Sequence, residues 1–363
     1  MKKNKNYVDL KDQPLPEGQH LLEVDDLKMY FHTEDGVVRA VDGVSYTLDR
    51  GETLGVVGES GSGKSVTAMT IMGLISMPPG KIEGGDVRYR GRSILEMTEE
   101  EMQHIRGNDI AMIFQDPMTS LNPVYKIGKQ VGEGLRLHRG YSKQEALKRA
   151  TELLDLVGIP EPEKRVNEYP HQFSGGMRQR VMIAMALACD PDILIADEPT
   201  TALDVTIQAQ IIELMQEMQE KNGNAIIMIT HDLGVVADMA DKIMVMYAGR
   251  PVEFGTAEEI FYESRHPYTW GLIRSIPEQA IDEKKPLTPI HGNPPSLMNL
   301  PEGCVFSPRC PYATDKCRKQ RPERVVTESG HYSACHYSGD PEFLKNAPET
   351  SRTRKDSKKG GEA

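Results

Sequence analysis

The sequence has few cysteines and lacks a long apolar run, and each shortage excludes a class of protein. Five cysteines in 363 residues are too few for a scaffold held together by disulfides. No uninterrupted apolar stretch approaches the roughly 18 to 20 residues that a membrane-spanning helix needs. The basic N-terminal residues are not followed by the apolar segment of a secretory signal, so we expect the chain to stay in the cytoplasm.

Basic residues are also in short supply. Lys and Arg total 43 against 54 Asp and Glu, which gives a formal charge of −11. This balance disfavours a protein that coats nucleic acid, because such binding depends on cationic side chains that neutralise phosphates. The length allows two domains, or one large domain with an appendage.

Short apolar runs at wide spacing indicate the core of an α/β fold. A β-like segment with Gly-containing breaks at residues 21–49 predicts a small antiparallel sheet. The apolar runs that suit buried parallel strands lie at residues 53–57, 193–196 and 225–229. Helical periodicity is found at residues 142–157, 179–188 and 208–221.

Residues 58–65, with the sequence Gly-Glu-Ser-Gly-Ser-Gly-Lys-Ser, fill every fixed position of the phosphate-loop pattern and follow an expected strand. Glycines let backbone N–H groups point at phosphates, and the following helix presents its positive end to the same anions. Lys64 would reach the β and γ phosphates of a nucleoside triphosphate, and Ser65 would bind Mg²⁺, although the loop alone leaves many NTPase classes open. The nucleotide-binding residues predicted here are Gly58, Ser60, Gly61, Gly63, Lys64, Ser65 and Val66.

The apolar run at residues 193–196 ends in two carboxylates that chemistry can use separately. Asp197 would hold Mg²⁺ through water, while Glu198 would polarise the attacking water as a general base. Taken alone, the pair could be two solvated acids at a strand end. The phosphate loop earlier in the chain favours the metal and base roles.

Residues 174–179, Ser-Gly-Gly-Met-Arg-Gln, place a serine and two glycines at an expected helix start. This hexapeptide resembles the signature of ATP-binding cassette (ABC) ATPases. In that family, the signature of one cassette completes the ATP site of another in a head-to-tail dimer. Since the chain has one phosphate loop, the resemblance implies a second cassette in trans, with nucleotide contacts from Ser174, Gly175, Gly176 and Gln179.

The resemblance assigns roles to further residues. Gln115, in Phe-Gln-Asp-Pro, matches the glutamine that senses Mg²⁺ and water, and His231 matches the switch histidine that contacts the γ-phosphate. Asp204, in Ala-Leu-Asp, matches the loop that signals between the two sites. Phe31 lies where the family stacks an aromatic side chain on adenine, with Tyr30 as a close competitor. No core motif is degenerate, so we expect an active ATPase.

Three segments resemble the oligopeptide, dipeptide and nickel importer branch of this family. They are residues 115–123, 265–269 and 303–311. The resemblance implies a motor subunit that drives oligopeptide uptake from the cytoplasmic face of the membrane, as a peripheral protein. Its implied partners are two transmembrane permease subunits, a related second ATPase and, indirectly, an extracytoplasmic peptide-binding protein. Dipeptide or nickel cargo stays open, because cargo need not touch this chain.

A different class would be a soluble ABC ATPase that acts on DNA or ribosomes. Such proteins usually carry long coiled-coil insertions, zinc modules or a second cassette in the same chain. The sequence has none of these features, so we expect a transporter motor without a nucleic-acid partner.

Four of the five cysteines lie close together in the sequence, separated by five, six and seventeen residues. Four thiolates could bind zinc or an iron–sulfur cluster, or could be reduced packing groups without metal. The family resemblance favours a [4Fe–4S] cluster on Cys304, Cys310, Cys317 and Cys335. His331 and His336 are expected to be surface or structural residues, and Cys189 a small buried apolar side chain.

The predicted fold is therefore an α/β phosphate-loop NTPase core of ABC type, with an N-terminal antiparallel β subdomain and a helical subdomain. A small C-terminal extension carries the four cysteines. The predicted boundaries are a tail at 1–20, the cassette at 21–262 with its helical subdomain at about 116–178, the extension at 263–340 and a disordered tail at 341–363.

Overall fold

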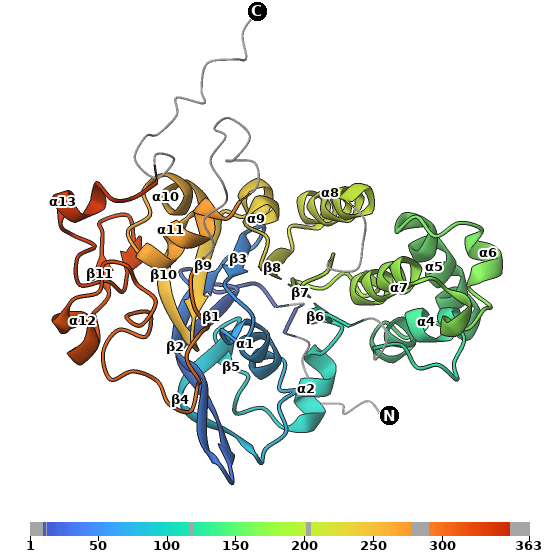
Figure 1. Cartoon of the computed structure of the whole chain (residues 1–363). Helices are drawn as coiled ribbons and strands as arrows, with labels where there is room; N and C mark the ends of the chain where they lie inside the picture. Colours follow the sequence, from blue (N-terminus) through green and yellow to red (C-terminus); the bar gives the residue numbers. More distant parts are fainter. Residues whose placement is uncertain (1–9, 12, 117–119, 201–204, 277–289, 349–363) are drawn as a thin grey trace, which may run out of the picture.

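The computed structural model describes residues 10–11, 13–116, 120–200, 205–276 and 290–348. Figure 1 shows a central sheet between two flanking parts. A helical unit, drawn in green, stands at one side, and the C-terminal extension, drawn in orange and red, lies at the other. The chain thus passes from a β-rich start through the helical unit and back into the sheet before it reaches the extension.

The central sheet supplies the strand ends that carry the nucleotide motifs. Its eight strands are β3 (Thr53–Val57), β6 (Ile110–Ile113), β7 (Ile193–Asp197), β8 (Ala225–Thr230), β9 (Lys242–Tyr247), β10 (Arg250–Thr256), β11 (Val325–Val326) and β12 (Tyr332–Ser333). Their order is β11-β12-β10-β9-β3-β8-β7-β6, and β9, β3, β8, β7 and β6 are parallel. Every residue of β3, β7 and β8 is buried, which explains their continuous apolar runs. The three predicted core strands are confirmed, with β7 and β8 slightly longer than expected.

The N-terminal segment forms a second, antiparallel sheet. Its strands are β1 (Leu22–Thr33), β2 (Gly36–Leu48), β4 (Gly80–Tyr89) and β5 (Arg92–Ser93), in the order β2-β1-β4-β5. The buried side chains Leu22, Leu27 and Met29 of β1 share a core with side chains of the central sheet. The expected antiparallel sheet is confirmed, and β4 and β5 extend it beyond the predicted segment.

The helices cover the sheets and build the separate helical unit. They are α1 (Lys64–Ile71), α2 (Glu99–Ile105), α4 (Ile127–His138), α5 (Lys143–Leu156), α6 (Pro162–Arg165), the 3₁₀ turn Pro170–Gln172, α7 (Gly175–Leu187), α8 (Val205–Asn222), α9 (Leu233–Met239), α10 (Ala257–Tyr262), α11 (Pro267–Arg274), α12 (Asp315–Lys319) and α13 (Pro341–Leu344). The apolar faces of α4, α5 and α7 pack together, with Leu135, Leu153 and Val181 in their common core. Ser142 and Glu145 form a capping box at the start of α5, which fixes where that helix begins.

The C-terminal extension is continuous with the cassette. Strand β12 pairs antiparallel with β10, and β11 pairs with β12, so the extension lengthens the central sheet at one edge. Its side chains Val305 and Phe306 share a buried core with Val57 and Tyr247 of the cassette. The small unit expected after residue 262 therefore shares both a sheet and a core with the part before it.

The chain beyond residue 340 differs from the expectation. Residues 341–348 include helix α13, and its Phe343 ring lies 5.3 Å from the Trp270 ring of α11, measured between centroids. The prediction of disorder at 341–363 is wrong for residues 341–348, because this aromatic contact gives the segment a partner to pack on. Residues 349–363 lie outside the described part.

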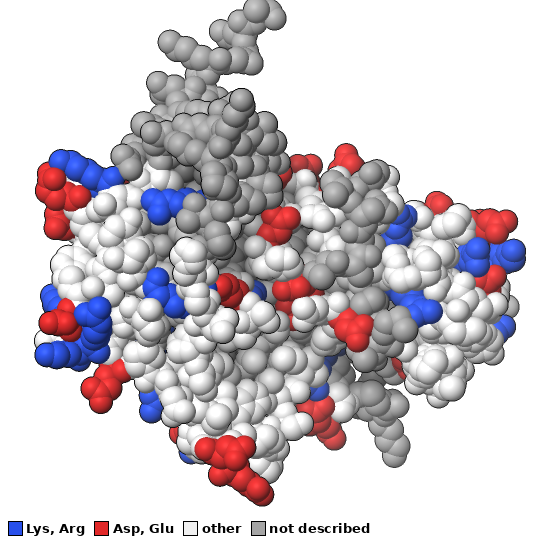
Figure 2. All heavy atoms as spheres, viewed as in Figure 1, with Lys and Arg blue, Asp and Glu red and all other residues white. Residues whose placement is uncertain are grey.

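Among the described helices, none combines the length and apolar character needed to cross a membrane. On the face of the molecule drawn in Figure 2, acidic and basic side chains of the described residues are interspersed over all three parts. Neither sign of charge forms a continuous area on that face.

Candidate active site

The phosphate loop connects β3 to α1 and depends on glycine at two points of close backbone approach. At Gly58 the φ angle is +151°, and a Cβ atom there would lie 2.2 Å from the carbonyl oxygen of Met246. At Gly63 the φ angle is +98°, and a Cβ atom would lie 2.3 Å from the carbonyl oxygen of Ala40. Gly63 is also the N-cap of α1 and offers no side chain to cap it. The first N–H groups of α1 therefore stay available to an anion.

Lys64 lies at the centre of this loop. Its side chain is buried, and Nζ donates to the carbonyl oxygens of Gly58 at 2.7 Å and Glu59 at 3.1 Å. Burial lowers the pKa of Lys64, while the nearby carboxylates of Glu198 and Asp197 act in the opposite direction. The ammonium group is thus held by the loop itself, where phosphate oxygens of a nucleotide would meet it.

Ser65 and Asp197 bring two oxygen ligands together from distant parts of the chain. Ser65 is the second residue of α1, Asp197 is the last residue of β7, and the Ser65 hydroxyl donates to Asp197 Oδ1 at 3.0 Å. Burial raises the pKa of Asp197, against the effect of this hydrogen bond. Mg²⁺ prefers oxygen ligands and usually takes one or two carboxylates plus substrate phosphates, so this pair suits it.

The Glu198 carboxylate contacts one residue from each of two other motifs, and both motifs lie far from it in the sequence. Gln115 Nε2 donates to Glu198 Oε2 at 2.9 Å, and His231 Nδ1 lies 3.3 Å from Oε1. The backbone of Glu198 has a φ angle of +47°, and its N–H donates to the carbonyl oxygen of Ile229 on β8. The parallel strands β6, β7 and β8 end at one edge of the sheet, which is why residues 115, 198 and 231 meet.

The signature residues lie at the start of α7. Ser174 is its N-cap and accepts a hydrogen bond from the Met177 N–H at 3.3 Å, and both Ser174 and Gly175 are exposed. Gln179 is buried, and its Nε2 donates to the carbonyl oxygen of Pro199 at 2.6 Å. Pro199 directly follows Glu198 in the sequence. Helices α7 and α1 stand apart in Figure 1. The sequence did not indicate the link between the signature helix and Pro199.

The structure separates the two aromatic candidates for adenine stacking. The Tyr30 hydroxyl donates to Asp42 Oδ1 at 3.0 Å, and Asp42 is also paired with Arg250 at 2.8 Å. Phe31 is partly exposed and, as the next residue of β1, points to the other face of the strand. Tyr30 is therefore engaged within the chain, which favours Phe31 for this role.

The remaining predicted nucleotide residues fall into two groups. Val66 lies on α1 and packs against the core of the N-terminal sheet. Asp204 lies outside the described residues. Two residues that sequence reasoning missed, Tyr268 and Arg309, contact the phosphate loop at Glu59. The sequence did not indicate these contacts, because Tyr268 and Arg309 belong to the C-terminal extension, far along the chain from the phosphate loop.

The four clustered cysteines line one cavity of about 20 Å³ in the extension. Its wall also includes aromatic side chains and two histidines, namely His266, Phe306, Tyr312, His336, Tyr337 and Phe343. Burial raises the pKa of Cys304, that of Cys310 to about 11 and that of Cys335 to about 12. Across the part of the chain that the structure describes, no group of three or more His, Cys, Asp or Glu is placed to hold a single metal ion.

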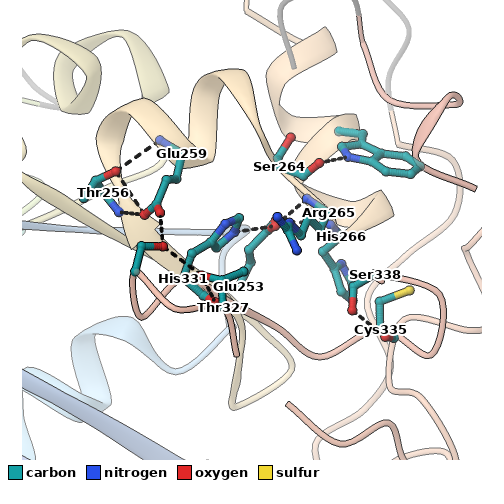
Figure 3. A network of polar contacts seen from close by, with 12 residues as sticks. Glu253, Thr256, Glu259, Ser264, Arg265, His266, Thr327, His331, Cys335 and Ser338 are labelled. Atoms are coloured by element: carbon teal, nitrogen blue, oxygen red, sulfur yellow. Dashed lines mark hydrogen bonds and ion pairs between the residues drawn. The ribbon is translucent and has the colours of Figure 1, made fainter. Parts of the chain in front are cut away.

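The two histidines near Cys335 have different surroundings. His331 is buried, and its Nε2 lies 3.1 Å from Glu253 Oε1 (Figure 3). His336 Nε2 lies 2.9 Å from the carbonyl oxygen of Gln320. The expected structural role fits His331. The fifth cysteine, Cys189, is buried one residue after the C-cap of α7.

Glu253 on β10 fastens the extension to the sheet. Besides His331, its carboxylate accepts hydrogen bonds from the Arg265 N–H at 2.5 Å and the His266 N–H at 3.3 Å, as Figure 3 shows in part. The His266 ring is buried, which lowers its pKa to about 4. One buried carboxylate thus fixes both the loop before α11 and the segment before β12.

Two family models match different parts of the chain. The model described as "ABC transporter" matches residues 41–201, and the model described as "Oligopeptide/dipeptide transporter, C-terminal region" matches residues 252–317. The second match covers the first three of the four clustered cysteines.

Curated relatives match most of the chain. The oligopeptide transport ATP-binding protein OppD of Bacillus subtilis is 58% identical over 86% of this chain and 87% of its own length. The dipeptide transport ATP-binding protein DppD of Escherichia coli is 52% identical over 88% of this chain and 97% of its own length. Among solved structures, the ATP-binding cassette MJ0796, described as a dimer in a post-hydrolysis state bound to ADP and Pi, is 29% identical. It has a TM-score of 0.60 and covers 65% of this chain and 98% of its own.

Proposed function

The chain belongs to the ABC transporter family and is an ATP-hydrolysing subunit of a transporter of the oligopeptide and dipeptide type, and from this premise we propose that it drives oligopeptide uptake. The similarity to OppD of Bacillus subtilis, whose name gives oligopeptide transport, supports this cargo. Dipeptides are the second candidate, because DppD of Escherichia coli is nearly as similar.

The observation that carries the catalytic part of the proposal is the convergence on Glu198. With its oxygens facing Gln115 and His231, Glu198 is oriented to take a proton from the attacking water. Lys64 would bind the β and γ phosphates, and the Ser65 hydroxyl and Asp197 carboxylate, 3.0 Å apart, would hold Mg²⁺. When bound, Mg²⁺ neutralises charge on the phosphates.

The complete ATP site takes a second cassette. The exposed Ser174 and Gly175 at the start of α7 provide a hydroxyl and free N–H groups at a helix end, which suits the phosphates of a nucleotide held by another subunit. Asp204 would carry the signal between the two sites. We expect the partner cassette to be a related chain, in a head-to-tail dimer.

The transmembrane partners would dock next to Gln115. Three apolar side chains that precede or follow Gln115 in the sequence are unusually exposed. Phe114 is 38% exposed, Val124 71% and Tyr125 44%. Exposed apolar side chains near Gln115 would suit a protein partner. Docking there would place the chain at the cytoplasmic face of the membrane and would connect Gln115 to the permease subunits.

Purification of the chain from solubilised membranes, with identification of every bound subunit, tests this function. We expect two permease subunits, a second ATPase and, from intact cells, a peptide-binding protein outside the membrane. Reconstituted with these subunits in vesicles, the complex should hydrolyse ATP faster when an oligopeptide is present outside. Stimulation by a dipeptide but not by longer peptides would change the cargo, and recovery with ribosomes or DNA would overturn the transporter role.

The four cysteines are proposed to hold a [4Fe–4S] cluster. In support, all four line one cavity walled by aromatic side chains, so water has little access to it. A single zinc ion needs four sulfurs at about 2.3 Å from one point, whereas a four-iron cluster takes one cysteine per iron and accepts more widely spaced thiols.

Anaerobic purification tests the cluster. We expect a brown protein that absorbs near 400 nm and contains about four iron atoms per chain. Cys317→Ser should remove the colour, whereas Cys189→Ser, which changes a buried cysteine outside the cavity, should keep it. Zinc in place of iron, or neither metal, would refute the cluster.

A further inference from the structure

Glu59, at a position that the phosphate-loop pattern does not fix, is held by two residues of the C-terminal extension. Its backbone N–H donates to the Tyr268 hydroxyl at 2.9 Å. Its carboxylate accepts from both terminal nitrogens of Arg309, with Nη1 at 2.5 Å from Oε2 and Nη2 at 3.0 Å from Oε1. The extension therefore grips one residue of the loop by its backbone and by its side chain.

Arg309 is itself rigidly placed. Its side chain is 4% exposed, and it also donates to the carbonyl oxygens of Ile290 at 3.1 Å and His291 at 2.9 Å and to the Tyr247 hydroxyl at 3.3 Å. A guanidinium fixed by this many acceptors presents a pre-formed two-pronged donor, which lysine cannot copy. The pair with Glu59 is therefore specific in geometry as well as in charge.

The same two residues adjoin the cysteine cavity. Arg309 directly precedes Cys310, and both of their N–H groups donate to the Phe306 carbonyl oxygen at 3.0 Å. The Tyr268 ring lies 5.3 Å from the Phe306 ring, and Phe306 lines the cavity. Because Phe306 contacts both Arg309 and Tyr268, a change in the packing of the cavity would move both residues that hold Glu59.

Glu59 is coupled in turn to the phosphate-binding lysine. Lys64 Nζ donates to the Glu59 carbonyl oxygen at 3.1 Å, so the residue that Arg309 and Tyr268 hold also supplies an acceptor to Lys64. A shift of Glu59 would move the group that positions the ammonium. The catalytic side chains Gln115, Glu198 and His231 have no part in these contacts with Glu59.

We infer that Arg309 and Tyr268 are positioning residues for nucleotide binding: the C-terminal extension holds the phosphate loop in its ATP-binding conformation through Glu59. This inference rests on the proposed function, because it treats residues 58–65 as the phosphate site. It assigns the extension a role in ATP affinity and leaves the hydrolytic step to other residues. Arg309 and Tyr268 both contact Phe306, which lines the cysteine cavity. A change in the packing of that cavity should therefore also change the affinity for ATP.

The test measures KM for ATP and kcat in the reconstituted transporter. Arg309→Lys keeps the charge but loses the two-pronged contact, so KM should rise about tenfold while kcat stays within about threefold. Tyr268→Phe removes one hydroxyl and should raise KM by a smaller factor. Titration of the purified chain with MgATP should show the same weakening of binding.

Arg90→Lys is the matched control. Arg90 forms a buried ion pair with Asp192 at 2.6 Å, with side chains 4% and 5% exposed, away from the phosphate loop. This variant should lose stability as Arg309→Lys does and keep the wild-type KM. If Arg309→Lys does not fold, Glu59→Gln and Tyr268→Phe carry the test.

Unchanged KM in Arg309→Lys and Tyr268→Phe would overturn the inference, and so would a rise in KM that Arg90→Lys shares. Failure of the proposed function would look different. In that case Glu198→Gln would hydrolyse ATP normally, whatever the Arg309 variants do.

Discussion

The phosphate-loop side and the signature side of the nucleotide machinery differ in how much of their geometry one chain supplies. On the first side, Ser65 contacts Asp197, and Gln115 and His231 face Glu198, all within this chain. On the second side, Ser174 caps its own helix and stays exposed to solvent. The first region is formed by contacts within the chain, whereas the second is open to solvent. This difference is what the proposed head-to-tail dimer would require, because there the exposed signature of one chain completes the ATP site of another.

The largest effect is expected on the assembled side. Glu198→Gln keeps the size and shape of the side chain but removes the base, so ATP turnover should fall at least about 100-fold while ATP binding persists. Steady-state hydrolysis and MgATP titration check the two parts. Glu152→Gln, which alters an exposed carboxylate of α5, should leave both unchanged. Near-normal turnover by Glu198→Gln would remove this residue from its role.

A smaller effect is expected at the adenine end of the same side. Phe31→Ala should weaken MgATP binding by about 1 to 3 kcal/mol, the usual contribution of one stacked base. Tyr30→Phe loses only the hydrogen bond to Asp42 and should bind MgATP as the wild type does. Isothermal titration measures both. If Tyr30→Phe weakened binding and Phe31→Ala did not, the adenine would be assigned to the face of β1 that carries Tyr30.

The smallest effect should appear on the exposed side, and only in the dimer. Ser174 and Ser142 are both N-cap serines that accept a backbone hydrogen bond at 3.3 Å. Alanine at either position should reduce the free energy of unfolding by about 1 kcal/mol, through loss of the cap. Only Ser174→Ala should also reduce hydrolysis in the assembled transporter, by about tenfold, because in the proposed dimer its hydroxyl would serve a second subunit. Equal rates of hydrolysis in Ser174→Ala and Ser142→Ala would contradict a role for Ser174 in the ATP site of a second subunit.

Local patterns predicted the parts of this site that lie within one strand and the turn after it. The phosphate loop follows β3 and the Asp197–Glu198 pair closes β7, as the sequence indicated, since continuous apolar runs mark buried parallel strands. Gln115 and His231 were identified by family resemblance alone. Their contacts with Glu198 depend on the order of β6, β7 and β8 in the sheet, which no local pattern encodes.

The C-terminal extension was predicted less completely. Its cysteines were recognised as a group, and the cavity brings all four together. The sequence did not indicate that β12 would pair with β10 or that residues 341–348 would pack on Trp270. Two-residue strands and short helices carry too little periodicity to be detected, and such segments are ordered by their neighbours.

The sequence by itself determined the chemical groups and their local settings: glycines where the backbone must approach closely, a lysine and a serine at a helix start, and two carboxylates at a strand end. Tertiary structure alone decided which groups meet, as Glu198 meets His231 and Glu59 meets Arg309. The physical reason is the separation along the chain between the groups that interact. Backbone conformation and capping are settled within a few residues, whereas contacts across 33 or 250 positions depend on strand order and on the cores that hold the sheet and the extension together.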